Sequence, residues 1–186
     1  SSANLKDWTY ESSFGKGYGC HEGVWECPDL FELPVEGKNY SKWVLVCNIN
    51  PGGPAGGSAT QYFTGTFDGH KFTCDTKPDV TKWADYGKDN YAGVTFDNAP
   101  DGRRIMIGWM SNWQYANQAP TQQYRSANTI ARDLYLYTDG TTEYLALKPS
   151  VENEKMRGKA AVKKNISGSK TISKMFSKPR GTYEVV

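Results

Sequence analysis

Three Asp-Gly pairs, at residues 68–69, 101–102 and 139–140, constrain the fold of this 186-residue chain more than any other feature. Each pair lies between two apolar runs, and Asp-Gly supplies the positive φ angles of the tight turns that join antiparallel strands. We therefore predict three β-hairpins, in the segments TQYFTGTFDGHKFT, AGVTFDNAPDGRRIMIGWM and RDLYLYTDGTTEYLAL.

Two further strand-like segments, GVWECPDLFEL and KWVLVCNIN, precede the hairpins, and no part of the first 147 residues has a good helical period. Regularly spaced hairpins without helices favour an all-β fold of the sandwich, barrel or propeller type. The glycine-rich segment NPGGPAGGSATQYF lacks the GK[ST] of a phosphate-binding loop. We interpret it as a tight passage where the backbone approaches another strand or a ligand.

The strand RIMIGWM is apolar on both of its faces. Ile105, Ile107 and Trp109 share one face, and Met106 and Met110 share the other. A strand that is apolar on both faces is typical of burial between two layers, so we predict that this one is covered on each side.

The composition changes after Leu147. The first 147 residues carry 12 Lys and Arg against 17 Asp and Glu, whereas the last 39 carry 10 against 3. We expect residues 148–186 to be a linker and the beginning of a β-sandwich, with a short helix at SVENEKMRG that has Ser150 as its N-cap. The lysines are interspersed with Gly, Ser and Val and have no aromatic stacking platform, so we predict no nucleic-acid partner.

The cysteines form no CxxC pair, and the sequence has only two histidines, which argues against a zinc site. We expect no metal or cofactor, and free thiols rather than a disulfide framework, although the sequence leaves one disulfide open. The four cysteines are Cys20, Cys27, Cys47 and Cys74. No segment approaches the ~20 apolar residues of a membrane span, so no membrane partner is expected. We expect an extracellular or periplasmic location rather than a cytoplasmic one.

Three segments resemble glycoside hydrolase family 32, which includes invertases, levanases and inulinases. They are GVWECPDLFELP, GGSATQYFTGTFDG and DYGKDNYAGVTFDNAPDGRRIMIGWMSNWQYANQAPTQQYRSANTIARDLYL, in the family's order and with similar spacing. The resemblance covers roughly residues 3–150. It implies a five-bladed β-propeller followed by a β-sandwich, with residues 1–147 forming about three C-terminal blades.

The resemblance also assigns a role to Glu26, which matches the glutamate acid/base of these retaining fructosidases. Such a group must keep its proton near neutral pH, and packing among apolar side chains disfavours the charged form of a carboxyl. Trp25 and Phe31 are expected to supply those surroundings. The alternative is an ordinary strand glutamate that faces water.

Asp85, Asp89 and Tyr91 lie in WADYGKDNYAG, a block that the resemblance places beside the fructose-binding pocket. Acidic groups there would accept hydrogen bonds from sugar hydroxyls. The alternative is turn chemistry around Gly87, which Asp and Asn favour.

Three other side chains are further candidates for sugar contacts. Trp109 and Trp113 would stack on a sugar ring, with packing in the core as the alternative. Gln61 follows the glycine-rich segment and is expected to face the funnel of the propeller.

Two family motifs are absent from this sequence. The nucleophile normally lies in Trp-x-Asn-Asp-Pro-Asn-Gly and the aspartate that stabilises the transition state in Arg-Asp-Pro, whereas Arg132-Asp133 is followed here by Leu134. The resemblance therefore implies a fragment of a fructosidase acting on a fructose-containing oligo- or polysaccharide, inactive by itself.

Two other classes stay open: a non-catalytic carbohydrate-binding β-domain, and a structural β-protein without a ligand. The truncated edge of the propeller is expected to promote self-association.

Overall fold

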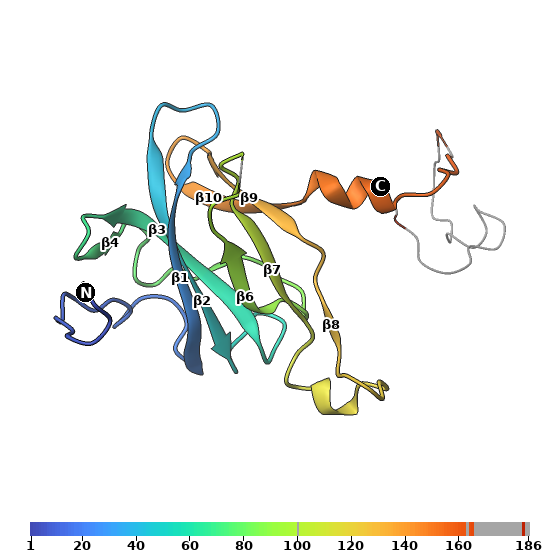
Figure 1. The fold of residues 1–186 in the computed structure, drawn as a ribbon, viewed down its shortest axis with the longest axis horizontal. Coiled ribbons are helices and arrows are strands. Elements are labelled where there is room, and N and C mark those ends of the chain that lie inside the picture. Colours follow the sequence, from blue (N-terminus) through green and yellow to red (C-terminus); the bar gives the residue numbers. More distant parts are fainter. Residues whose placement is uncertain (100, 163, 166–183, 185–186) are drawn as a thin grey trace. The chain divides into compact units, whose positions relative to one another are not determined.

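The structure, a computed structural model, describes residues 1–99, 101–162, 164–165 and 184. The chain divides into one compact unit of residues 1–150 and a second unit of residues 151–186. The regular secondary structure of the first unit is almost entirely antiparallel strand (Figure 1), which confirms the all-β prediction.

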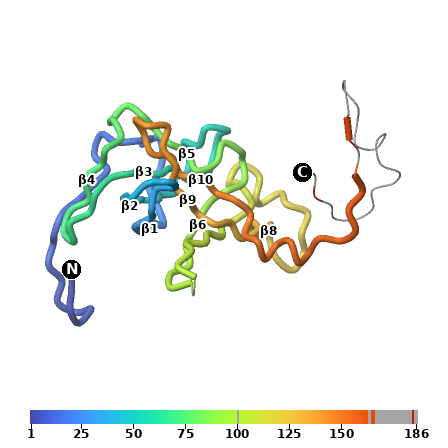
Figure 2. The backbone as a smooth tube through the Cα atoms, turned by 90° about the horizontal axis from the view of Figure 1, so that it is seen from above, coloured from blue at the N-terminus to red at the C-terminus, as the bar shows by residue number. Residues whose placement is uncertain are grey.

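Sheet A contains, in spatial order, β1 (Val24–Pro34), β2 (Ser41–Asn50), β3 (Ala59–Phe67) and β4 (Phe72–Cys74), with β5 (Lys82–Trp83) paired to β3. Sheet B contains β10 (Glu143–Pro149), β9 (Arg132–Thr138), β7 (Ile105–Met110) and β6 (Tyr91–Phe96), with β8 (Ala127–Asn128) paired to β7. In both views β4 lies at the edge of sheet A away from sheet B (Figures 1 and 2).

All three predicted hairpins are confirmed, as β3–β4, β6–β7 and β9–β10. Gly69, Gly102 and Gly140 have φ angles of 93°, 72° and 101°, which residues with a side chain rarely adopt. Asp68 and Asp139 accept hydrogen bonds from backbone N–H groups of their own turns. Asp-Gly therefore acts here through both of its residues.

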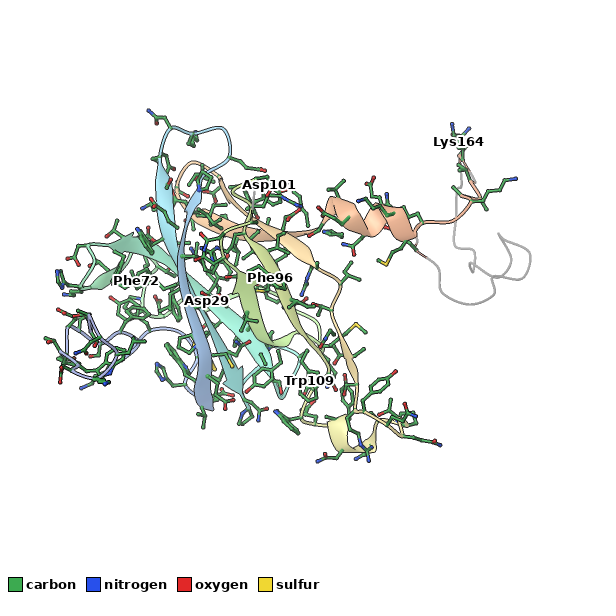
Figure 3. All side chains as sticks on the ribbon, in the orientation of Figure 1. Asp29, Phe72, Phe96, Asp101, Trp109 and Lys164 are labelled. Atoms are coloured by element: carbon green, nitrogen blue, oxygen red, sulfur yellow. The ribbon has the colours of Figure 1, made fainter. Side chains whose placement is uncertain are left out.

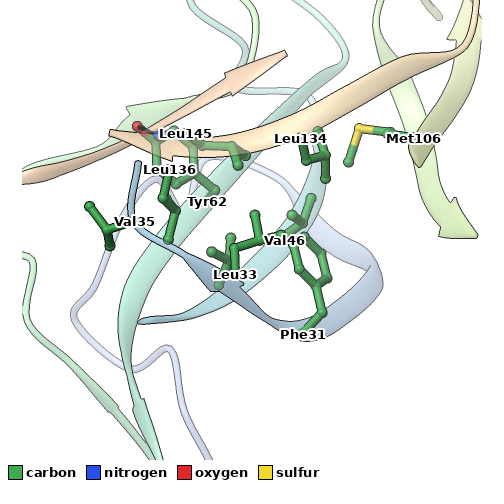
Figure 4. Close-up of a cluster of buried hydrophobic side chains, with 10 residues drawn as sticks. Phe31, Leu33, Val35, Val46, Tyr62, Met106, Leu134, Leu136 and Leu145 are labelled. Carbon is green, nitrogen blue, oxygen red and sulfur yellow. Dashed lines mark hydrogen bonds between the residues drawn. The ribbon is translucent and has the colours of Figure 1, made fainter. Parts of the chain in front are cut away.

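Among the described residues, one apolar cluster joins the two sheets. Leu134 and Leu136 of β9 face Val46 and Leu33 of sheet A (Figure 4). Burying one such side chain fully contributes about 1.5–3 kcal/mol to folding. The buried members of the cluster are Phe31, Leu33, Val35, Val44, Val46, Tyr62, Met106, Leu134, Leu136 and Leu145.

The opposite face of sheet A is covered by the N-terminal segment, which contains no strand. The Phe14 ring lies 5.1 Å from the ring centroids of Tyr18, Phe63 and Phe72. Phe63 and Phe72 are buried there. The N-terminal segment therefore works as a layer of aromatic packing.

The prediction that β7 is buried on both faces is wrong. Met106 is fully buried against sheet A, whereas Ile105, Ile107 and Trp109 are half-buried and Met110 is 47% exposed. In the described part of the chain, sheet A covers one face of sheet B and no other sheet covers the second face. The alternation of side chains thus marked an apolar face whose covering layer the described residues do not include.

The expected number of blades, about three, is not confirmed, because residues 1–150 form two sheets. The two-residue strands β5 and β8 extend sheets A and B and start no new sheet. A short 3-10 helix, η1 (Ala116–Gln118), lies between β7 and β8.

The second unit begins with a 3-10 helix, η2 (Val151–Met156), where the sequence predicts a short helix. Arg157 forms ion pairs with Glu154 at 3.0 Å and with Glu184 at 2.6 Å. Most of the predicted start of a β-sandwich lies outside the described residues. No helix within the described residues is long and apolar enough to cross a membrane, and all four cysteines are free thiols.

Candidate active site

Glu26 and Tyr91 meet across the two sheets. Glu26 lies near the beginning of β1 and Tyr91 begins β6, and the Tyr91 hydroxyl donates a short hydrogen bond to Oε2 of Glu26. Burial, together with the hydrogen bond to the Glu26 carboxylate and its charge, raises the pKa of Tyr91 above its ordinary value. The hydroxyl therefore stays protonated and remains a donor to Glu26.

Both strands are bulged directly after these two residues. The register of β1 shifts between Glu26 and Asp29, and that of β6 shifts between Tyr91 and Val94. Cys27 and Ala92, the residues that follow the pair, have φ angles of 47° and 50°. Bulges redirect side chains and are common beside active sites, and a left-handed backbone at non-glycine residues persists only where the surroundings enforce it.

Beyond the bulges, a second set of polar contacts ties β1 to β6. The Asp29 carboxylate accepts hydrogen bonds from the Thr95 backbone N–H at 3.1 Å and from its hydroxyl at 2.6 Å. Arg104 donates to the Thr95 hydroxyl oxygen at 3.2 Å and lies 4.9 Å above the Phe31 ring. The two strands are therefore fixed to each other just past the Glu26–Tyr91 pair.

The surroundings expected for Glu26 differ from those observed. Glu26 is exposed, not packed among apolar groups. Trp25 stacks on His21 at 4.7 Å and Phe31 lies in the core, so the prediction that these two side chains enclose the carboxyl is wrong. Because side chains alternate along a strand, Trp25 projects from the face of sheet A opposite to that of Glu26.

An aromatic wall extends from Tyr91. Its ring centroid lies 6.3 Å from that of Trp109, which lies 5.0 Å from that of Trp113. Trp109 is found at the end of β7 far from the β6–β7 turn that holds Asp101 (Figure 3). Trp113 is 52% exposed, so this wall offers an open aromatic surface beside Glu26, of the kind that lines ligand sites.

The glycine-rich loop holds this wall in place. A side chain at Gly57 would put its Cβ 2.1 Å from Oδ1 of Asn112, so only glycine allows the observed approach. The Asn112 amide donates to the carbonyls of Gly56 at 3.0 Å and Lys88 at 2.9 Å. The loop is therefore a tight backbone passage against the segment that carries Trp113.

The two predicted acidic residues have different surroundings. Asp89 accepts a short hydrogen bond from the Tyr115 hydroxyl. Asp85 accepts one from the Gly87 backbone N–H at 2.7 Å and pairs with Arg132 at 3.4 Å. Asp85 thus shows the turn chemistry that the sequence left as an alternative, and Asp89 is bound by Tyr115, which follows Trp113 by two residues.

Gln61 is the predicted site residue that lies apart from the others. It is fully buried, and its amide accepts a hydrogen bond from the Cys20 backbone N–H at 3.0 Å and donates one to the Cys20 carbonyl at 3.2 Å. Its side chain projects from the face of sheet A that the N-terminal segment covers, because its neighbour Thr60 faces sheet B. This placement fits a structural role and does not fit a sugar contact.

The sequence did not single out the buried polar residues behind Glu26, which are Asn48, Thr60 and Asn90. Asn48 lies in the apolar strand KWVLVCNIN on the same face as Val44 and Val46, and a polar residue at a position of predicted burial is a usable signal. Assigning Asn48 to a strand does not identify the groups that it binds, because these lie on other strands, so the sequence alone could not give it a role.

Comparison with known proteins adds a family match. The family model described as "Glycosyl hydrolases family 32 N-terminal domain" matches residues 1–149. The levanase of Bacillus subtilis (strain 168) is 46% identical over 190 residues, which cover 99% of this chain and 28% of that protein. The extracellular exo-inulinase of Meyerozyma guilliermondii (strain ATCC 6260) is 41% identical over 189 residues, covering 98% and 36%.

Solved structures show the same likeness. The exo-inulinase from Aspergillus awamori superposes with a TM-score of 0.74 at 43% identity, over 80% of this chain and 30% of that one. The β-fructofuranosidase from Schwanniomyces occidentalis gives a TM-score of 0.70 at 43% identity, over 80% and 29%. The chain thus spans about a third of the length of these relatives.

Proposed function

The chain belongs to glycosyl hydrolase family 32, and from that premise we propose that it is part of a retaining fructoside hydrolase in which Glu26 is the general acid and base. The observation that carries the proposal is the Glu26–Tyr91 pair, which two bulged strands hold beside an aromatic wall. A solvated strand glutamate would need neither bulge nor partner.

Retaining hydrolysis of a fructoside takes two steps. Glu26 first delivers a proton to the leaving oxygen while a second carboxylate attacks the sugar carbon, and Glu26 then removes a proton from the incoming water. Tyr91 binds Oε2 of Glu26, which leaves Oε1 for the transferred proton. Tyr91 thus acts on the glutamate, in addition to the sugar contact that the sequence suggested.

We propose a fructose-containing oligo- or polysaccharide as the substrate, since the relatives are named levanase, exo-inulinase and invertase. Trp109 and Trp113 offer ring faces to the sugar, and Asp89 accepts hydrogen bonds from its hydroxyls. The location proposed is outside the cell, because several relatives are named as extracellular enzymes.

We also propose that this chain alone does not complete the reaction. Neither the Asn-Asp-Pro nor the Arg-Asp-Pro motif occurs in its sequence, and Asp85 and Asp89 are engaged by Arg132 and Tyr115. The attacking carboxylate would then come from a part of the longer protein outside this chain.

The test is the Glu26→Gln variant of the protein encoded by the complete open reading frame. General acid catalysis is worth about 10²–10⁴-fold in rate, so kcat/KM on sucrose, which reports the step that needs the acid, should fall by that factor. The kcat/KM on a nitrophenyl fructoside, whose leaving group needs little protonation, should fall much less. The ratio of the two losses in kcat/KM is the measured quantity.

A matched control is Glu32→Gln, a change of the same charge on the same strand, which should leave both rates near the wild-type values. Equal losses on sucrose and on the nitrophenyl fructoside after Glu26→Gln would contradict the acid/base role. A protein that binds fructans and hydrolyses none of them would favour a non-catalytic carbohydrate-binding domain.

A further inference from the structure

We infer that Asn48 is a positioning residue for Glu26, because its amide ties together the two bulged strands that carry Glu26 and Tyr91. The inference rests on the proposed role of Glu26. It concerns a residue that touches neither substrate nor reacting atoms and acts through the backbone on each side of the pair.

Asn48 lies in β2 directly opposite Glu26 in the register of sheet A. Residues directly opposite each other on antiparallel strands project from the same face, so both side chains point toward sheet B. Asn48 is fully buried. Its Nδ2 donates to the carbonyls of Cys27 at 3.5 Å and Gly93 at 3.4 Å, and its Oδ1 accepts from the Gly93 N–H at 3.3 Å.

These partners are the irregular parts of both strands. Cys27 follows Glu26 at the left-handed position of the first bulge, and Gly93 lies within the second bulge, two residues after Tyr91. A bulge leaves backbone groups without ladder partners, and buried backbone groups need them. The amide of Asn48 supplies a partner to each of the two bulges and so fixes the distance between them.

Thr60 extends the same contact on β3, where it is directly opposite Asn48. Its hydroxyl lies 2.7 Å from Oδ1 of Asn48 and 3.0 Å from the carbonyl oxygen of Asn90, the residue before Tyr91. A hydroxyl has a single proton, so the two acceptors share it. Thr60 thereby orients the Asn48 amide and reaches the backbone of β6 at the start of its bulge.

The chemistry of the contact requires an amide. Cys27 and Gly93 offer carbonyl oxygens while Gly93 also offers an N–H, so the clamp must donate and accept at once. Among side chains of this size only asparagine does both in one plane, since an ionised aspartate accepts only and leucine does neither. The residue type at position 48 therefore follows from what the two bulges leave unpaired.

The experiment replaces Asn48 by Asp in the protein encoded by the complete open reading frame. The change keeps the size of the side chain and removes both donated hydrogen bonds. A displaced catalytic group costs up to about 10²-fold in rate, so kcat/KM on sucrose should fall about 10- to 100-fold. The loss of kcat/KM on a nitrophenyl fructoside should be at most a few-fold, because that leaving group departs without full protonation.

Val46→Ala is the matched control. Val46 lies on the same strand and the same face, is also fully buried and belongs to the apolar cluster. This variant should lower the melting temperature. The ratio of kcat/KM on sucrose to kcat/KM on the nitrophenyl fructoside should stay at the wild-type value. The control separates a weakened fold from a misplaced proton donor.

If the Asn48→Asp protein does not fold, Thr60→Val still tests the positioning role of Asn48. Valine has nearly the shape of threonine and lacks the hydroxyl, so the ratio should shift in the same direction by about 3- to 10-fold, an effect of one lost hydrogen bond. Thr60→Ser keeps the hydroxyl and should restore the wild-type ratio.

Equal losses on the two substrates for Asn48→Asp, or an unchanged ratio for Thr60→Val, would overturn the positioning role. The Glu26→Gln protein distinguishes this failure from a failure of the proposed function. If Glu26→Gln shows the leaving-group dependence and the Asn48 and Thr60 variants do not, only the role of Asn48 is wrong. If Glu26→Gln shows none either, the role of Glu26 itself is wrong.

Discussion

The two ends of the interface between sheets A and B are built differently. At one end, Val44, Val46 and Leu136 pack into the apolar cluster, and β2 pairs with β3, and β9 with β10, in continuous register. At the other end, Glu26 and Asn48 replace apolar side chains, and β1 and β6 are bulged. The same two sheets thus have a regular apolar end and an irregular polar end.

The difference separates stability from chemistry. Apolar burial is non-directional and tolerates small shifts, so the apolar end holds the sheets together without specifying any one side chain closely. Buried polar groups demand partners at defined distances, so the polar end fixes where Glu26 and Tyr91 meet. Substitutions at the two ends should therefore have different consequences.

The largest expected effect is the loss of hydrolysis when the chain, with the polar end it carries, is separated from the rest of the protein. Retaining hydrolysis needs two carboxyls about 5–5.5 Å apart, and in the proposed mechanism Glu26 supplies one of them. The isolated chain should release no fructose from sucrose, levan or inulin, while the protein from the complete open reading frame should. Turnover by the chain alone that Asp89→Asn abolishes would mean that the nucleophile lies within this chain.

Leu136→Ala should show the opposite behaviour at the apolar end. Truncating a buried leucine costs about 2–5 kcal/mol of stability, since a cavity remains. Denaturant unfolding should report that loss, and the ratio of sucrose to nitrophenyl fructoside turnover should stay at the wild-type value. A shift in the ratio similar to that of Glu26→Gln would show that the two ends are not separable.

Tyr91→Phe should have a smaller effect that is confined to the polar end. It removes the hydroxyl that binds Glu26 and keeps the ring beside Trp109. We expect kcat on sucrose to fall about tenfold, which corresponds to about 1.4 kcal/mol. A rise in KM with unchanged kcat would instead place Tyr91 on the sugar alone.

The smallest effect concerns surfaces outside the interface. Trp8 and Tyr10 are 67% and 78% exposed in the segment that covers the outer face of sheet A. Exposed aromatic groups there should favour weak self-association of the isolated chain. Light scattering should show a mass that rises with concentration, and less so after Trp8→Ser with Tyr10→Ser; a monomer at every concentration would contradict this.

Strands and hairpins could be predicted from the sequence because their signals are local. Asp68 and Gly69 carry their own turn chemistry, and the two segments read as strand-like, GVWECPDLFEL and KWVLVCNIN, form β1 and β2. The prediction that β7 is buried on both faces was wrong, because a pattern of apolar residues shows that a face needs to be covered and does not show which residues cover it.

The site was only partly predictable for a related reason. Glu26 and Tyr91 are 65 residues apart in sequence, and their contact depends on two bulges that no local pattern announces. Trp25 was expected beside the Glu26 carboxyl and Gln61 in the funnel of the propeller, whereas the alternation of the strands sends both side chains to the other face of sheet A. Asn48 had no role until the strands on both sides of it were known.

Chemical rescue of a Glu26→Ala variant by azide tests the central claim most directly. With a nitrophenyl fructoside the first step needs little acid, so the second step, which lacks its base, limits turnover. Azide needs no base to attack, and we predict faster turnover with added azide and a fructosyl azide of retained configuration. No acceleration, or an azide product of inverted configuration, would contradict the assignment of Glu26 as the general acid and base.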